Sequence, residues 1–164
     1  ADRFDYTVMG DTVNTASRLE SCANKTYGTK IIVEGGAAAM GTGNSATAIS
    51  PGNGSAGPAV SDNPAFVLRE LDTVFLPGKK EPVKLFELIC LASEKTSEIT
   101  NLLQVYAEGL AAYREGDFSK AIEKFESLTN DHPSQIMLAR CQKLATGQKP
   151  PELDENMIFR IINK

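Results

Sequence analysis

The 164-residue sequence lacks tryptophan, has a single histidine and contains no long hydrophobic run. No stretch approaches the roughly 18 apolar residues that a membrane-spanning helix needs, so the sequence predicts no membrane segment. A net charge of −4 without a basic stripe argues against nucleic acid as a partner. Cys22, Cys90 and Cys141 have no metal-ligand spacing, which favours reduced thiols in a cytoplasmic protein. The histidine, His132, precedes Pro133 in a turn-like stretch that suits a capping or surface role.

A short polar motif, GDTVNTASRLE, stands out near the start of the sequence. Gly10 permits a tight turn, after which Asp11 or Thr12 can cap the first turn of a helix. Asn14 and Arg18 are four residues apart, so their side chains leave one face of that helix a turn apart. An amide and a guanidinium presented together near a helix start suit a phosphorylated ligand.

The opposite side of this helix is predicted to be filled by Val13, Ala16 and Leu19. Taken alone, an Asn and Arg pair is also typical of a solvated helix face. The residues ahead of the motif favour the ligand-binding interpretation of this pair. With Phe4 to Met9, the stretch resembles the class III nucleotide cyclase signature, D-Y-T-V-x-G-D-x-V-N-x-A-x-R-L-E.

The resemblance extends over roughly positions 3 to 90. Residues 29–33 resemble the next strand of that family, and 68–88 resemble its closing hairpin. The resemblance implies that Asn14 orients the ribose and that Arg18 stabilises the transition state at the α-phosphorus. It also implies that Lys79, in the hairpin, holds the triphosphate. Pro77 replaces the usual family lysine before the glycine, so a second basic contact is not assigned.

The position of Thr7 corresponds to the family residue that faces the purine. A Thr hydroxyl accepts a hydrogen bond from the adenine amino group, and Thr is the residue of bacterial and soluble adenylate cyclases. The resemblance therefore implies ATP as the substrate. A hydroxyl also donates, so a guanylate cyclase stays open as an alternative.

Class III cyclases use two divalent cations, Mg²⁺ or Mn²⁺, held by two Asp residues of the N-terminal half of the domain. Asp2, Asp5 and Asp11 do not stand in that context, and we assign no metal ligand in this chain. The ligands are expected ahead of Ala1, which makes the sequence the C-terminal portion of a longer adenylate cyclase. Because the family site forms between two protomers, a second cyclase domain is the expected partner, either in a homodimer or in a paired arrangement. This portion alone is predicted to be inactive.

Three segments follow from the composition. Residues 1–92 are predicted to be the C-terminal half of a cyclase catalytic domain, interrupted by a flexible Gly/Ala/Ser-rich insert at 35–65. Residues 93–149 carry apolar residues at three- and four-residue spacing, which predicts helices over 101–115 and 117–129, with a third over 133–144. Residues 150–164 form a C-terminal tail. Gly109, Ala121, Phe125 and Pro133 match the small, aromatic and proline positions of a tetratricopeptide-like hairpin.

The sequence therefore predicts an α+β fold. It consists of a partial ferredoxin-like cyclase sheet with helices on one face, followed by a small tetratricopeptide-like helical extension. The predicted function is conversion of ATP to cyclic AMP and pyrophosphate in signal transduction. The alternative is a non-catalytic cyclase-like scaffold or dimerisation module with a helical docking tail, for which a protein partner is expected. The expected location is the cytoplasm, or the cytoplasmic side of a membrane if the remainder of the protein carries a transmembrane segment.

Overall fold

The protein is described from a computed structural model, which covers residues 11–35, 38 and 66–161. Its first part is a helical segment made of α1 (Asp11–Arg18), the π-helix η1 (Leu19–Ala23) and α2 (Asn24–Tyr27). The three pieces are continuous, since Arg18, Ala23 and Asn24 all have right-handed helical backbone angles. Gly28, with a φ of 64°, ends the segment, because a left-handed residue terminates a helix.

Four strands form one sheet in the order β1-β3-β2-β4, with β1 at Ile32–Glu34, β2 at Phe66–Phe75, β3 at Val83–Leu91 and β4 at Phe159–Arg160. β3 pairs antiparallel with both β1 and β2, whereas β4 pairs parallel with the end of β2. The β2–β3 register shifts twice, between Val67 and Leu68 and between Glu70 and Asp72. These irregularities bend the hairpin locally.

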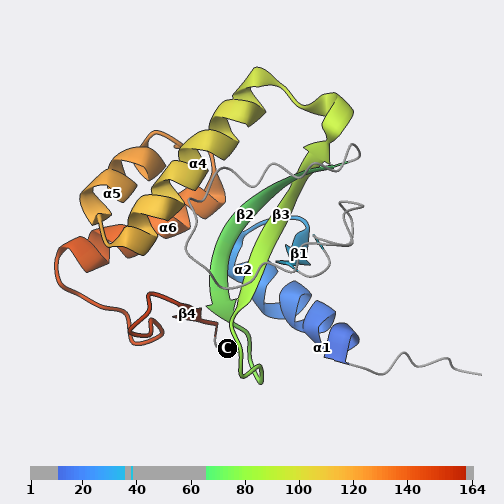
Figure 1. The fold of residues 1–164 in the computed structure, drawn as a ribbon, viewed down its shortest axis with the longest axis horizontal. Coiled ribbons are helices and arrows are strands. Elements are labelled where there is room, and N and C mark those ends of the chain that lie inside the picture. The colour runs from blue at the N-terminus through green and yellow to red at the C-terminus, as the bar shows by residue number, and fades with distance from the viewer. Residues whose placement is uncertain (1–10, 36–37, 39–65, 162–164) are drawn as a thin grey trace, which may run out of the picture.

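Three helices follow the hairpin: α4 (Ser97–Glu115), α5 (Phe118–Glu126) and α6 (His132–Ala145). They come after a single 3₁₀ turn, η2 (Ala92–Glu94). Thr96, Asp117 and Asp131 cap the three helices by accepting a hydrogen bond from a backbone N–H three residues on. Figure 1 shows the three helices stacked together beside β2.

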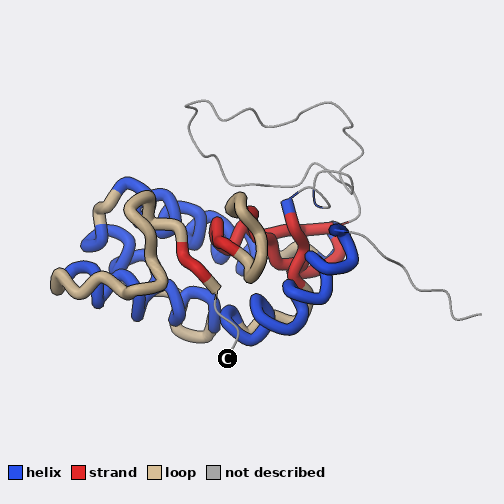
Figure 2. The backbone as a smooth tube through the Cα atoms, turned by 90° about the horizontal axis from the view of Figure 1, so that it is seen from below, coloured by secondary structure: helices blue, strands red, loops and turns tan. Residues whose placement is uncertain are grey.

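One hydrophobic core joins the hairpin, the N-terminal helical segment and the three later helices. One face of the β2–β3 hairpin lies against α2, α4 and α6, and Figure 2 shows the helices to the left of and below the strands. From the sheet this core takes Leu71, Val74, Leu76 and Leu85, and from the helices it takes Leu19, Tyr27, Tyr106, Tyr113, Phe125 and Met137. The predicted α+β class with helices on one face of a partial cyclase-like sheet is confirmed.

The predicted elements agree with the structure in type and differ at some ends. The hairpin predicted over 68–88 is present, with its turn at Pro77–Gly78, and the three later helices are present. The strand predicted over 29–33 begins only at Ile32, and the helix predicted to Thr129 ends at Glu126. The predicted insert at 35–65 lies almost entirely outside the described residues.

The prediction for the apolar side of the first helix is right for Leu19, which is buried in the core, and wrong for the other two residues. Val13 is 37% exposed and Ala16 is exposed, so neither fills the core. The buried residues are instead four apart: Thr15, Leu19, Ala23 and Tyr27. The π-helical turn begins at Leu19, so it affects the spacing of Leu19, Ala23 and Tyr27 and does not account for the exposure of Val13 and Ala16.

Candidate functional site

Asn14 and Arg18 lie one turn apart on α1, as their spacing predicted. Asn14 is exposed, and Arg18, the last residue of α1, is half-buried. Directly after Arg18 the backbone changes to the π-helix η1. Such turns occur often at functional sites in proteins.

The tip of the β2–β3 hairpin lies against Arg18. A Cβ built on Gly78 would stand 3.0 Å from Nη2 and 3.4 Å from Cζ of Arg18. Gly78 has a φ of 71°, and the Lys79 N–H closes the turn by donating to the Leu76 carbonyl at 3.0 Å. The structure thus brings the guanidinium of Arg18 to the turn that carries Lys79, 61 positions away in the sequence.

The turn is firmly seated, because Leu76 at its start is buried in the core. Lys79 itself is half-buried, and Lys80 is exposed. A packed helix and a packed turn therefore hold the Arg18 guanidinium against the turn in which Lys79 lies. That combination suits the oxygens of a phosphate chain.

One predicted site residue is not placed by the structure. Thr7, predicted to contact the purine, lies outside the described residues, as do Asp2 and Asp5. Within residues 11–35, 38 and 66–161, no three or more His, Cys, Asp or Glu side chains gather as a metal site would require. The groups that do meet at Arg18 and Gly78 fit a phosphate and do not fit a divalent cation.

Two buried ionic clusters escaped the sequence analysis, and both connect the sheet to α6. In the first, Asp72 of β2 accepts a hydrogen bond from the Tyr27 hydroxyl and one from Nη1 of Arg140, each at 2.6 Å. In the second, Arg69 of β2 contacts Glu87 of β3 and donates to the Asp131 cap of α6 at 2.8 Å. Charged residues inside apolar strands, at 69, 72 and 87, were the signal in the sequence.

Burial and neighbouring charges together set the protonation of both clusters. Burial is the largest single influence on the pKa of Arg140 and lowers it, but Asp72, Tyr27 and Tyr113 together outweigh burial and leave that pKa raised well above its usual range. Burial, followed by the charge of Asp72, raises the pKa of Tyr27 well above its ordinary value. The Arg69 pKa is also raised, since Glu87 and Asp131 outweigh desolvation. Both arginines and the phenol therefore keep their protons across the physiological range.

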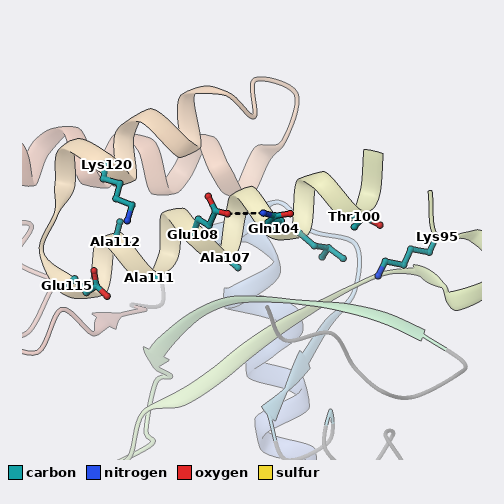
Figure 3. Close-up of a pocket in the computed structure, with 10 residues that line it drawn as sticks. Lys95, Thr100, Gln104, Ala107, Glu108, Ala111, Ala112, Glu115 and Lys120 are labelled. Atoms are coloured by element: carbon teal, nitrogen blue, oxygen red, sulfur yellow. Dashed lines mark hydrogen bonds between the residues drawn. The ribbon is translucent and has the colours of Figure 1, made fainter. Parts of the chain in front are cut away.

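A separate groove of about 400 Å³ runs along the outer face of α4 and the start of α5 (Figure 3). Its walls combine apolar and alanine side chains with Glu108, Glu115 and Lys120. Gln104 donates to Glu108 across one turn at 3.0 Å, the dashed contact in Figure 3. Asn14, Arg18 and Lys79 do not line this groove.

Comparison with known proteins points toward cyclases. The chain is 27% identical over 145 residues to "Adenylate cyclase, terminal-differentiation specific" of Dictyostelium discoideum, an alignment covering 85% of this chain. It is 55% identical over 39 residues, 24% of its length, to "Adenylate cyclase 1" of Rhizobium meliloti (strain 1021). These matches support a relationship to adenylate cyclases.

The chain spans 6% of the length of each of these two relatives. No family model and no solved structure matches it. Across the described part of the chain, no helix is both long and apolar enough to span a bilayer.

Proposed function

We propose that this chain supplies the Asn14, Arg18 and Lys79 half of a class III adenylate cyclase site that converts ATP to cyclic AMP and pyrophosphate. One observation carries the proposal: the guanidinium of Arg18 lies against the hairpin turn that carries Lys79. Support comes from the relationship to two adenylate cyclases. Because the chain spans only 6% of those proteins, the activity proposed is that of a longer protein containing it.

The reaction forms one bond and breaks one. The ribose 3′-oxygen bonds to the α-phosphorus, the bond from that phosphorus to the bridging oxygen breaks, and pyrophosphate leaves with that oxygen. The 3′-hydroxyl proton passes to solvent or a base. Negative charge grows on the α-phosphoryl oxygens and on the leaving oxygen, so a fixed cation there lowers the barrier.

In this proposal Arg18 donates to those oxygens as their charge develops, and Asn14, one turn earlier on the exposed face, orients the ribose. Lys79 binds the triphosphate, whose charge is already present in the ground state. Thr7 reads adenine. Bound Mg²⁺ or Mn²⁺ would activate the 3′-hydroxyl and neutralise phosphate charge. The described residues around Arg18 do not form a site for such ions. We expect the metal ligands to come from the N-terminal half of a second cyclase domain, which corresponds to sequence ahead of Ala1.

Kinetics of the longer protein test these roles. Arg18→Ala should lower kcat by about 10²–10³-fold with little change in KM, because the lost donor acts mainly in the transition state. Lys79→Ala should instead raise KM for ATP, since the triphosphate is charged throughout. Lys80→Ala, on the same hairpin turn, is the matched control and should leave both constants near the wild-type values.

Three outcomes would count against the proposal. An Arg18→Ala effect confined to KM would remove its role in the transition state. Formation of cyclic GMP in preference to cyclic AMP would favour the guanylate alternative. An inactive wild-type protein that still dimerises would favour the scaffold alternative. The isolated 164-residue chain is expected to make no cyclic AMP with either metal ion, and robust turnover would show that its metal ligands lie within it.

A further inference from the structure

The helix that carries Asn14 and Arg18 is held at its far end by α6. Tyr27, the last residue of α2, is fully buried and donates to Asp72 at 2.6 Å. Arg140 of α6 donates to the same carboxylate oxygen at 2.6 Å and contacts the Tyr27 hydroxyl at 3.4 Å. Tyr27, Asp72 and Arg140 thus form one closed triangle in the core, which we call the Tyr27 triangle.

A second contact between α6 and the same helical segment lies next to this triangle. A Cβ built on Gly28, which caps α2, would stand 2.1 Å from Cδ2 of His132. His132 begins α6, and Arg140 follows it about two turns later. Thus α6 contacts the end of the helical segment at two points, through His132 and through Arg140. Two separate contacts resist both translation and rotation of that segment.

Two members of the triangle, Asp72 and Arg140, have further contacts outside it. The second oxygen of Asp72 accepts from the Thr73 N–H at 2.8 Å, and the guanidinium of Arg140 lies 4.3 Å from the centre of the Phe159 ring. All three members are at least nine-tenths buried. A buried carboxylate with all its partners present is rigid, whereas loss of one partner leaves a costly unpaired charge.

We propose that Arg140 of α6 positions the Asn14 and Arg18 helix through Asp72 and Tyr27, so that docking of the helical extension sets the activity of the site. This inference rests on the proposed function for its consequence in turnover. Its structural half, the coupling of α6 to residues 11–23, stands without it. Arg140, Asp72 and Tyr27 are positioning residues, since they act through the helix and touch no substrate.

Amide hydrogen exchange of the 164-residue chain tests the coupling. Tyr27→Phe removes one buried hydroxyl and should speed exchange of residues 11–23 about tenfold, the effect of losing roughly one buried hydrogen bond. Tyr106→Phe is the matched control, because its hydroxyl is equally buried and donates to the Leu71 carbonyl at 2.9 Å. It should lower Tm by a similar amount while leaving exchange at 11–23 unchanged.

The α6 end is tested with two substitutions of Arg140. Arg140→Met should also speed exchange at 11–23, although it lies more than a hundred positions away, and Arg140→Lys should restore part of the protection. If Arg140→Met fails to fold, Tyr27→Phe still tests the coupling, because it removes a single oxygen atom and the variant is expected to fold. Equal exchange at 11–23 in Tyr27→Phe and Tyr106→Phe would overturn the coupling.

Turnover of the longer protein tests the consequence. At matched loss of Tm, Tyr27→Phe should lower kcat several-fold with KM unchanged, and Tyr106→Phe should not. Equal kcat in the two variants would overturn the positioning role. If the wild-type protein makes no cyclic AMP but the exchange results hold, the proposed function fails and the coupling of α6 to the helix stands.

Discussion

Gly78 shows how a single residue without a side chain can organise a candidate site. Its φ of 71° lies where L-residues are strained, and its missing Cβ leaves space that the guanidinium of Arg18 occupies. An alanine there would stand 3.0 Å from Nη2 of Arg18, which would have to move by a few tenths of an ångström. Catalysis is sensitive to displacements of this size.

Gly78→Ala is therefore expected to destabilise the protein by about 1–2 kcal/mol through backbone strain and to lower kcat as well. Gly116→Ala is its control, because Gly116 has a φ of 79° and nothing within 4 Å of a built Cβ. Denaturant unfolding should show that Gly116→Ala lowers the free energy of unfolding by a similar amount, whereas its turnover should be unchanged. Equal turnover in the two variants would show that the contact with Arg18 is irrelevant to the site.

Residues of the site were predictable to different degrees. The spacing of Asn14 and Arg18 defines a shared helix face, so the sequence was sufficient for that pair. The meeting of Arg18 with Gly78 was not predictable from spacing, because it depends on how a helix and a distant turn pack. The Asp72–Arg140 pair escaped for a similar reason: a charged residue inside an apolar strand marks Asp72, but its partner lies 68 positions away and cannot be found from the local pattern.

At the scale of elements, the helical hairpin α4–α5 depends on a large residue facing a small one. Phe125 is fully buried, and a Cβ on Gly109 would stand 2.9 Å from two of its ring atoms. Tyr106 meets the same ring edge-to-face with centroids 5.4 Å apart. The predicted match of these positions to a tetratricopeptide-like hairpin stays a prediction, whereas the close packing is observed.

Phe125→Ala should destabilise the protein by about 3–5 kcal/mol, because it removes a whole ring from an enclosed site. Phe118→Ala is the comparison, since Phe118 lies only half-buried beside Tyr113 and should cost clearly less. Chemical denaturation gives the free energies, and limited proteolysis reports whether α4–α5 opens first. Equal losses for both variants would contradict the enclosed position of Phe125.

The elements themselves were more predictable than their ends. Three- and four-residue apolar spacing located α4 and α5, because local side-chain periodicity reflects local backbone geometry. The apolar side of the first helix was predicted only in part, since Leu19 is buried whereas Val13 and Ala16 are exposed. The sheet partner of β4 was also beyond reach: its pairing with β2 joins residues 85 positions apart.

For the molecule as a whole, the buried groups set how stability depends on pH. Burial raises the pKa of Cys141 from its ordinary 9.0 to about 12, and that of Tyr113 from 10.0 to about 12. Burial also raises the pKa values of Tyr27 and Tyr106. These groups belong to the core shared by the sheet and the helices, so their ionisation opposes the whole fold.

The sign of the effect follows from which state binds the protons. Below about pH 9 these groups are protonated in both folded and unfolded chains, and the full stability is present. Between pH 9 and 12 the unfolded chain loses its protons first, which favours unfolding by up to about 1.4 kcal/mol per pH unit for each group. The free energy of unfolding should therefore fall steeply over this range. Arg69 and Arg140 stay charged throughout, since the pKa of each is raised.

Two measurements on the 164-residue chain check this expectation. Denaturant unfolding at a series of pH values should show the loss of stability beginning near pH 9, and Cys141→Ala should make that loss shallower by removing one titrating group. Ultraviolet difference spectra should show that the three buried tyrosines ionise together with unfolding, because a phenolate has no solvent in the core. Ionisation of these tyrosines near pH 10 in a chain that remains folded would contradict the shared core, and with it the docking of α6 on the helix that carries Arg18.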